Sequence, residues 1–188
     1  MLFRSDVNTY TIAFRLFALL FNLLNIWLVG RILQVMGRPA RTVTLGMLLY
    51  AWNPLLLLES ALGGHNDGFM ITFVLIGILL AANAERQGQM LRARGYLPVV
   101  AALTLAALVK FTALPILAAY LLFLVSKALR PTAESPRELR QALRNWQPAL
   151  LILAWSSLCA ALLALVLYGP FWFGHSLTTI VGSFKNPP

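Results

Sequence analysis

The residues best suited to chemistry lie in one short turn, Gly63-Gly64-His65-Asn66-Asp67-Gly68, between two long apolar runs. His65 offers an acid/base imidazole, Asn66 a neutral amide and Asp67 a carboxylate, and the glycines let the backbone approach a ligand closely. Polar groups are costly to place in a lipid-buried chain, so the turn indicates a substrate-binding or catalytic site. The alternative is structural: Asn66 or Asp67 caps the helix that begins near Gly68.

A second candidate is Lys110, which interrupts a long apolar stretch together with Pro115. An ammonium group well inside hydrocarbon costs roughly 3 kcal/mol, so Lys110 is expected to face a cavity or an anion. A lysine binds phosphate as a point charge, which makes a lipid phosphate the favoured partner. The alternative is that Lys110 extends from a short helix end to the headgroups.

Further polar residues accompany these two. Arg15, Asn22 and Asn25 are spaced so that they share one helix face or lie close to it. We expect the asparagines to make hydrogen bonds between helices and Arg15 to be a second phosphate contact near the outer end. Glu59 lies about one turn before Gly63 and either borders the same cavity or is solvated at its rim.

The segment Tyr168–His175 ends the last apolar run with aromatic residues. Such residues are typical of the membrane boundary, and the functional alternative is that Trp172 lines a sugar or polyprenyl site with His175 as a polar contact. Neither histidine has metal-ligand spacing to a partner, and Cys159 is the only cysteine, so we expect no metal site and no cofactor.

The composition determines the class of protein. Sixty per cent of the residues are hydrophobic and 11% are charged, which excludes an ordinary soluble domain. We expect an all-α integral membrane helical bundle in one transmembrane domain, residues 1–188. The net charge of +9 does not indicate nucleic-acid binding, because the basic residues cluster in short loops between apolar spans.

The predicted bundle has about six transmembrane helices. A long apolar stretch at 97–129 must be split near Lys110, because it exceeds what one moderately tilted helix needs and contains a charge and a helix breaker. Asn53-Pro54 predicts a kink within the second span. The remaining spans are expected at about 10–33, 42–61, 67–84 and 148–169.

Basic residues predict the orientation. Eleven of the fifteen lie in three loops, at 31–41, 85–95 and 127–144. If all three loops are cytoplasmic, both termini lie outside, and the His65–Asp67 turn, Lys110 and the Pro170–His175 segment share the extracytoplasmic face. The 130–147 loop is then a basic cytoplasmic linker that touches anionic headgroups.

In their order along the chain, several motifs resemble the polytopic glycosyltransferase C superfamily, and above all the bacterial polyprenyl-phosphate-mannose-dependent mannosyltransferases. They are Asn53-Pro54, Glu59, Gly64–Gly68, Ala107–Thr112 with Pro115, Pro170–Trp172 and Gly174. The resemblance implies a multi-pass inner-membrane enzyme that transfers a sugar, mannose being expected, from a polyprenyl-phosphate donor to an extracytoplasmic acceptor.

The resemblance also implies residue roles. A carboxylate would deprotonate the acceptor, for which Asp67 and Asp6 are the candidates, while Lys110 stabilises the leaving lipid phosphate and His65 and Asn66 contact donor or acceptor. Members of the superfamily usually carry their catalytic acid in an extracytoplasmic loop that follows an additional N-terminal helix. This chain lacks that acidic loop, so we expect a shortened relative or a fragment.

Two other functions fit the sequence. The first is a non-catalytic subunit that kept the glycosyltransferase scaffold and packs against partner membrane subunits in a larger complex. The second is a small transporter, which broken helices and buried charges would also suit, although the sequence shows no inverted repeat. An enzyme needs an open outward pocket containing Lys110 and the turn, whereas a subunit would fill that space.

Overall fold

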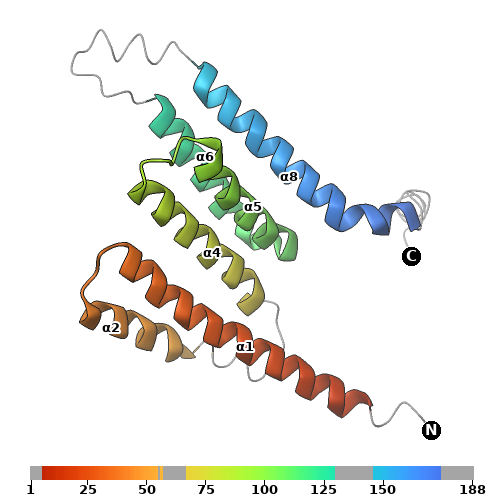
Figure 1. The fold of residues 1–188 in the computed structure, drawn as a ribbon. Helices are drawn as coiled ribbons and strands as arrows, with labels where there is room; N and C mark the ends of the chain where they lie inside the picture. Colours follow the sequence, from red (N-terminus) through yellow and green to blue (C-terminus); the bar gives the residue numbers. More distant parts are fainter. Residues whose placement is uncertain (1–5, 55, 57–66, 130–145, 175–188) are drawn as a thin grey trace.

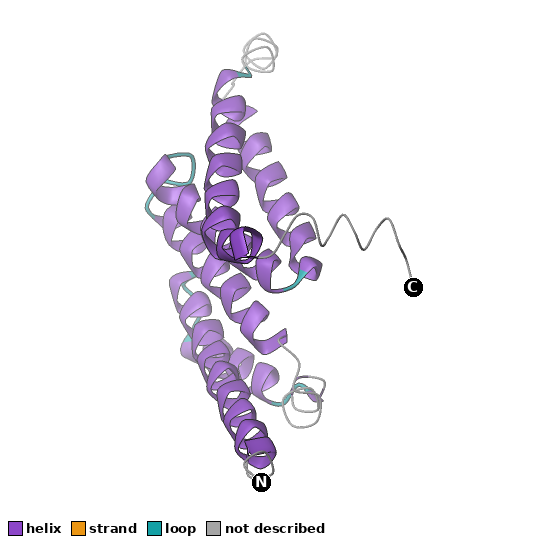
Figure 2. Cartoon of the chain, turned by 90° about the vertical axis from the view of Figure 1, so that its right-hand side faces the viewer, coloured by secondary structure: helices purple, strands orange, loops and turns teal. Residues whose placement is uncertain are grey.

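Long apolar helices build the protein, as its composition predicts. The computed structural model describes residues 6–54, 56, 67–129 and 146–174, and every regular element in these ranges is helical. The elements are α1 (Asp6–Val35), α2 (Ala40–Ala51), α4 (Asp67–Arg86), α5 (Ala93–Val109), the short 3-10 helix η2 (Phe111–Ala113), α6 (Leu114–Leu129) and α8 (Gln147–Gly174). Figure 2 shows these helices, with short described loops between some of them.

The helices are long and apolar enough to form a membrane bundle. Four described segments can cross a membrane by length and composition: 12–35, 67–86, 111–129 and 147–169. The shorter apolar helix α5 accompanies them. The expected all-α helical membrane bundle is therefore confirmed, with α5 and α6 as the pair broken around Lys110.

One predicted span differs from the structure. The second span was expected at 42–61 with a kink at Asn53-Pro54. Helix α2 ends at Ala51, Trp52 and Asn53 leave the helix, and Pro54 and Leu56 are helical again, so the interruption falls at the expected position but is a full break. Pro54 explains this end, because a proline disfavours the helical conformation of the residue before it and supplies no backbone N–H donor. Most of the rest of that predicted span lies outside the described residues.

Helix α5 is the centre of the packing. It contacts α4, α6 and α8, while α1 packs against α4 and α2 packs against α1. Small residues allow this close approach. At Gly77 of α4, an added Cβ would lie 2.9 Å from Leu103 Cδ2 of α5, so only a glycine fits there without displacing that leucine.

Successive helices alternate in direction, so the chain places its polar segments at two opposite ends (Figure 1). The α1–α2 turn, the α4–α5 turn and the last turn of α6 share one end, which we call the basic end; it carries Arg38, Arg41, Arg86, Arg92 and Lys127. The first turn of α4 and the α5–α6 break lie at the opposite end. This arrangement agrees with the orientation expected from the basic loops.

Candidate functional site

The two ionisable residues that the sequence singles out most strongly contact each other. Lys110 Nζ donates a hydrogen bond to Asp67 Oδ1, and the two side chains form an ion pair. The Asp67 side chain is 17% exposed and the Lys110 side chain is 43% exposed. The carboxylate is therefore largely enclosed, whereas the ammonium remains open to a further anion.

The break between α5 and α6 positions Lys110. Its backbone is extended, with φ −153° and ψ 124°, so α5 stops at Val109 and a single 3-10 turn leads into α6. The Lys110 N–H still donates to Ala106 O, and Lys110 O accepts from Ala113 N–H, each at 3.0 Å. Because both backbone groups are paired, the break leaves neither of them unsatisfied in an apolar setting.

Helix α8 holds the end of α5 in place. The Tyr168 hydroxyl donates a hydrogen bond of 2.9 Å to Leu108 O, two residues before Lys110. The last carbonyls of a helix have no partner within that helix, so this bond satisfies one of them. It also ties the backbone beside Lys110 to a second long helix.

A buried network positions Asp67. Asn25 of α1 is fully buried, and its Nδ2 donates to Gly68 O at 2.9 Å. Its Oδ1 lies 2.7 Å from the Thr72 hydroxyl, which also lies 2.9 Å from Gly68 O. Asn25 therefore crosslinks α1 to the first turn of α4, next to Asp67. The sequence-based expectation that Asn25 bonds between helices agrees with this geometry.

An apolar aromatic wall flanks this turn. Phe17 and Phe21 of α1 and Phe69 and Phe73 of α4 form a continuous series, with ring centroids 4.5 to 5.9 Å apart. Phe69 lies two residues from Asp67. The series joins α1 to α4, so together with the Asn25 network it fixes the first turn of α4 against α1.

The structure does not unite all predicted site residues. Arg15 is exposed on α1, ten residues from Asn25, which corresponds to about 15 Å along the helix axis. Asp6 is the first residue of α1, and Trp172 lies in the last turn of α8. The predicted contacts at Glu59, His65, Asn66 and His175 lie outside the described residues.

Sequence reasoning missed two residues that shape the site. Thr72 was overlooked because a threonine in an apolar helix usually bonds its own backbone, and here it also bonds Asn25. Tyr168 was interpreted as part of an aromatic belt or of the lining of a sugar or polyprenyl site, not as a hydrogen-bond partner of α5. Its signal was weak, since nothing in a sequence reveals which carbonyl a boundary tyrosine can reach.

The described residues contain no group of three or more His, Cys, Asp or Glu side chains that could hold a metal ion. Among the described residues, this site offers one ammonium, one carboxylate and the backbone around them. Such a set can bind and neutralise a phosphate.

Comparison with known proteins gives one match. The family described as "Alpha-(1->6)-mannopyranosyltransferase, N-terminal domain" matches residues 1–126, which include Asn25, Asp67 and Lys110. No curated protein and no solved structure matches the chain.

Proposed function

Because the chain belongs to the alpha-(1->6)-mannopyranosyltransferase family through the N-terminal domain of that family, we propose that it transfers mannose from a polyprenyl-phosphate donor to an extracytoplasmic acceptor hydroxyl. The observation that carries this proposal is the ion pair of Lys110 with Asp67, which leaves the ammonium partly exposed at the end opposite the basic loops. The positive-inside rule makes that end extracytoplasmic, and the bacterial inner membrane is the proposed location.

The proposed reaction is a single displacement. The acceptor oxygen forms a bond to the anomeric carbon while the bond from that carbon to the phosphate oxygen breaks, and the configuration inverts. The acceptor proton passes to a carboxylate, and the polyprenyl phosphate leaves with the electron pair. Lys110 stabilises the negative charge that develops on the leaving phosphate.

The contact with Lys110 bears on the role of Asp67. An ammonium has three N–H donors, so Lys110 can hold Asp67 and a phosphate oxygen together. Asp67 then lies on the leaving-group side of the anomeric carbon, whereas a base must act on the opposite side. We therefore assign Asp67 to positioning Lys110. Asp6 is 19 residues from Asn25 along α1, about 28 Å along the helix axis, so it lies too far from Lys110 to act as the base in the same step.

The exposure of Lys110 also bears on the alternative function. A non-catalytic subunit would be expected to bury or pair fully a cation at this depth, since an unused charge in the membrane is costly. Lys110 is paired with Asp67 and still 43% exposed, which supports room for a further anionic ligand.

The test is mannosyl transfer by the full chain in proteoliposomes that contain polyprenyl-phosphate mannose and a mannoside acceptor. Lys110→Ala should lower the transfer rate about 10- to 150-fold, because a hydrogen bond to a charged group is worth about 1.5–3 kcal/mol. Arg41→Ala, an exposed cation at the basic end, is the matched control and should retain the wild-type rate. Transfer by Lys110→Ala at the wild-type rate would refute the phosphate role, and a wild-type chain that transfers nothing would favour the subunit.

A further inference from the structure

A second feature lies at the basic end, far from Lys110, and does not depend on the proposed function. A groove of about 500 Å³ lies among α1, α4 and α6, and its volume falls within the roughly 300–1,000 Å³ range of small-molecule sites. Most of its lining is apolar and includes Met36, Ile78, Met90, Tyr120 and Phe123. Ile78 and Phe123 are 42% and 46% exposed, so the groove is open at the surface of the bundle.

The mouth of this groove is polar and cationic. A smaller cavity of about 270 Å³ shares Glu85 and Met90 with the groove and is also lined by Arg92 and Lys127. Arg86 lines the groove itself. The two cavities are therefore lined by three cations, Arg86, Arg92 and Lys127, and by one carboxylate, Glu85.

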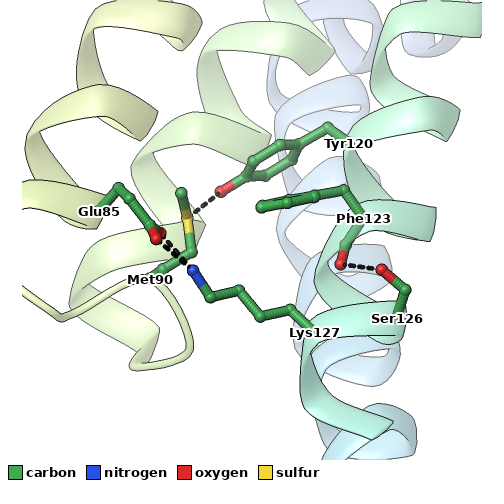
Figure 3. A network of polar contacts seen from close by, with 6 residues as sticks. All are labelled: Glu85, Met90, Tyr120, Phe123, Ser126 and Lys127. Carbon is green, nitrogen blue, oxygen red and sulfur yellow. Dashed lines mark hydrogen bonds and ion pairs between the residues drawn. The ribbon is translucent and has the colours of Figure 1, made fainter. Parts of the chain in front are cut away.

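The carboxylate is already occupied. Lys127 Nζ lies 2.5 Å from both oxygens of Glu85 and 5.6 Å from the centroid of the Phe123 ring (Figure 3). The Tyr120 hydroxyl lies 3.5 Å from Met90 Sδ, close to this ion pair (Figure 3). Since Glu85 and Lys127 neutralise each other, Arg86 and Arg92 remain as exposed charges at the mouth.

We propose that this groove binds one anionic glycerophospholipid, with an acyl chain along Ile78 and Phe123 and the phosphate headgroup at Arg86 and Arg92. Charge complementarity carries the assignment: the body of the groove is apolar, its mouth is cationic, and the mouth lies at the end where the basic loops meet the membrane surface. Basic pockets between helices on that side of a membrane suit anionic headgroups. The Glu85–Lys127 pair holds α4 to α6 and keeps the groove walls in place.

The experiment measures lipid binding to the full chain in detergent by native mass spectrometry. Phosphatidylglycerol and phosphatidylcholine with the same acyl chains are titrated in parallel. One phosphatidylglycerol should bind about tenfold or more tightly than phosphatidylcholine, because each basic residue near the headgroup contributes about 1 kcal/mol. Equal binding of the two lipids would overturn the proposal.

Two variants locate the site. Arg86→Gln with Arg92→Gln should weaken phosphatidylglycerol binding about 10- to 30-fold, whereas Arg38→Gln with Arg41→Gln, the matched control outside the groove, should change it by less than about twofold. Equal losses in the two double variants would assign the binding to diffuse surface charge and overturn the proposal.

A third variant tests the apolar body without a change in charge. Ile78→Trp replaces an aliphatic side chain with a larger indole in the groove. The position is already exposed, so the fold should tolerate the change. It should reduce the binding of both lipids, and unchanged binding would overturn the placement of the acyl chain. Displacement of phosphatidylglycerol by an equimolar amount of polyprenyl phosphate would reassign the groove to the donor and would likewise overturn the proposal.

Discussion

Replacing Asp67 with Asn separates two roles that a carboxylate beside Lys110 could have. If Asp67 positions Lys110, the change removes a charge-assisted hydrogen bond and leaves a long, flexible ammonium side chain less ordered. If Asp67 is the base, the change removes the group that accepts the acceptor proton. The first role predicts a modest loss of turnover, and the second predicts a loss of about 10²- to 10⁴-fold.

The modest loss can be bounded from the exposure of the pair. Fully exposed ion pairs contribute about 0.2–1 kcal/mol, and breaking a buried pair costs about 3–5 kcal/mol. With side-chain exposures of 17% and 43%, the pair lies between these limits. We expect about 1–2 kcal/mol, which corresponds to a 5- to 30-fold fall in turnover.

The assay is a double-mutant cycle on turnover in proteoliposomes. Asp67→Asn should cost nothing further when Lys110 is already alanine, because the residue that it positions is then absent. Donor affinity is a poorer measure, since loss of the carboxylate also removes its repulsion of the donor phosphate. The thermal midpoint of each variant shows whether a loss of turnover reflects unfolding. Additive losses, or a fall beyond about 100-fold in Asp67→Asn alone, would refute the positioning role.

Two further predictions concern orientation and packing. The first uses single cysteines in a background without Cys159. Phe111→Cys, at a position that is 83% exposed, should react with an impermeant maleimide added outside intact cells, whereas Gln87→Cys should react only after lysis. The reverse pattern would mean that the proposed orientation is inverted. Gly77→Val should destabilise the bundle by about 1–3 kcal/mol through its clash with Leu103, seen as a lower thermal midpoint; an unchanged midpoint would show that this leucine relocates freely.

The sequence alone predicted the break at Lys110 because two independent signals coincide there: a charge inside an apolar stretch and a proline five residues later. The sequence also placed Lys110 and Asp67 at the same end of the bundle, because the chain between them is predicted to cross the membrane twice. It could not predict their contact, because hydropathy does not determine which helices are neighbours. That contact requires α4 to pack against α5, where Gly77 lies against Leu103.

At the end of α2, hydropathy alone extends the span, whereas Asn53-Pro54 predicted the interruption that the structure shows. Apolar residues continue well past Ala51, so a window average extends the span, whereas a single proline changes the backbone locally. The Asn25 network was predictable only in part. A buried amide in an apolar helix must find partners, but a sequence does not identify Gly68 and Thr72 as those partners.

The shortness of α5 has a consequence for the surrounding bilayer. Seventeen residues extend only about 25 Å, less than the hydrocarbon thickness of about 30 Å, whereas the 30 residues of α1 and the 28 of α8 exceed it. If α5 begins at the inner boundary, Lys110 lies a few ångströms below the outer one, next to the longer helix α8. The bilayer must therefore be locally thinner around Lys110 for headgroups and water to contact it. A thicker membrane should hinder access to the ammonium, so that hydrophobic mismatch controls the access of a ligand to this site.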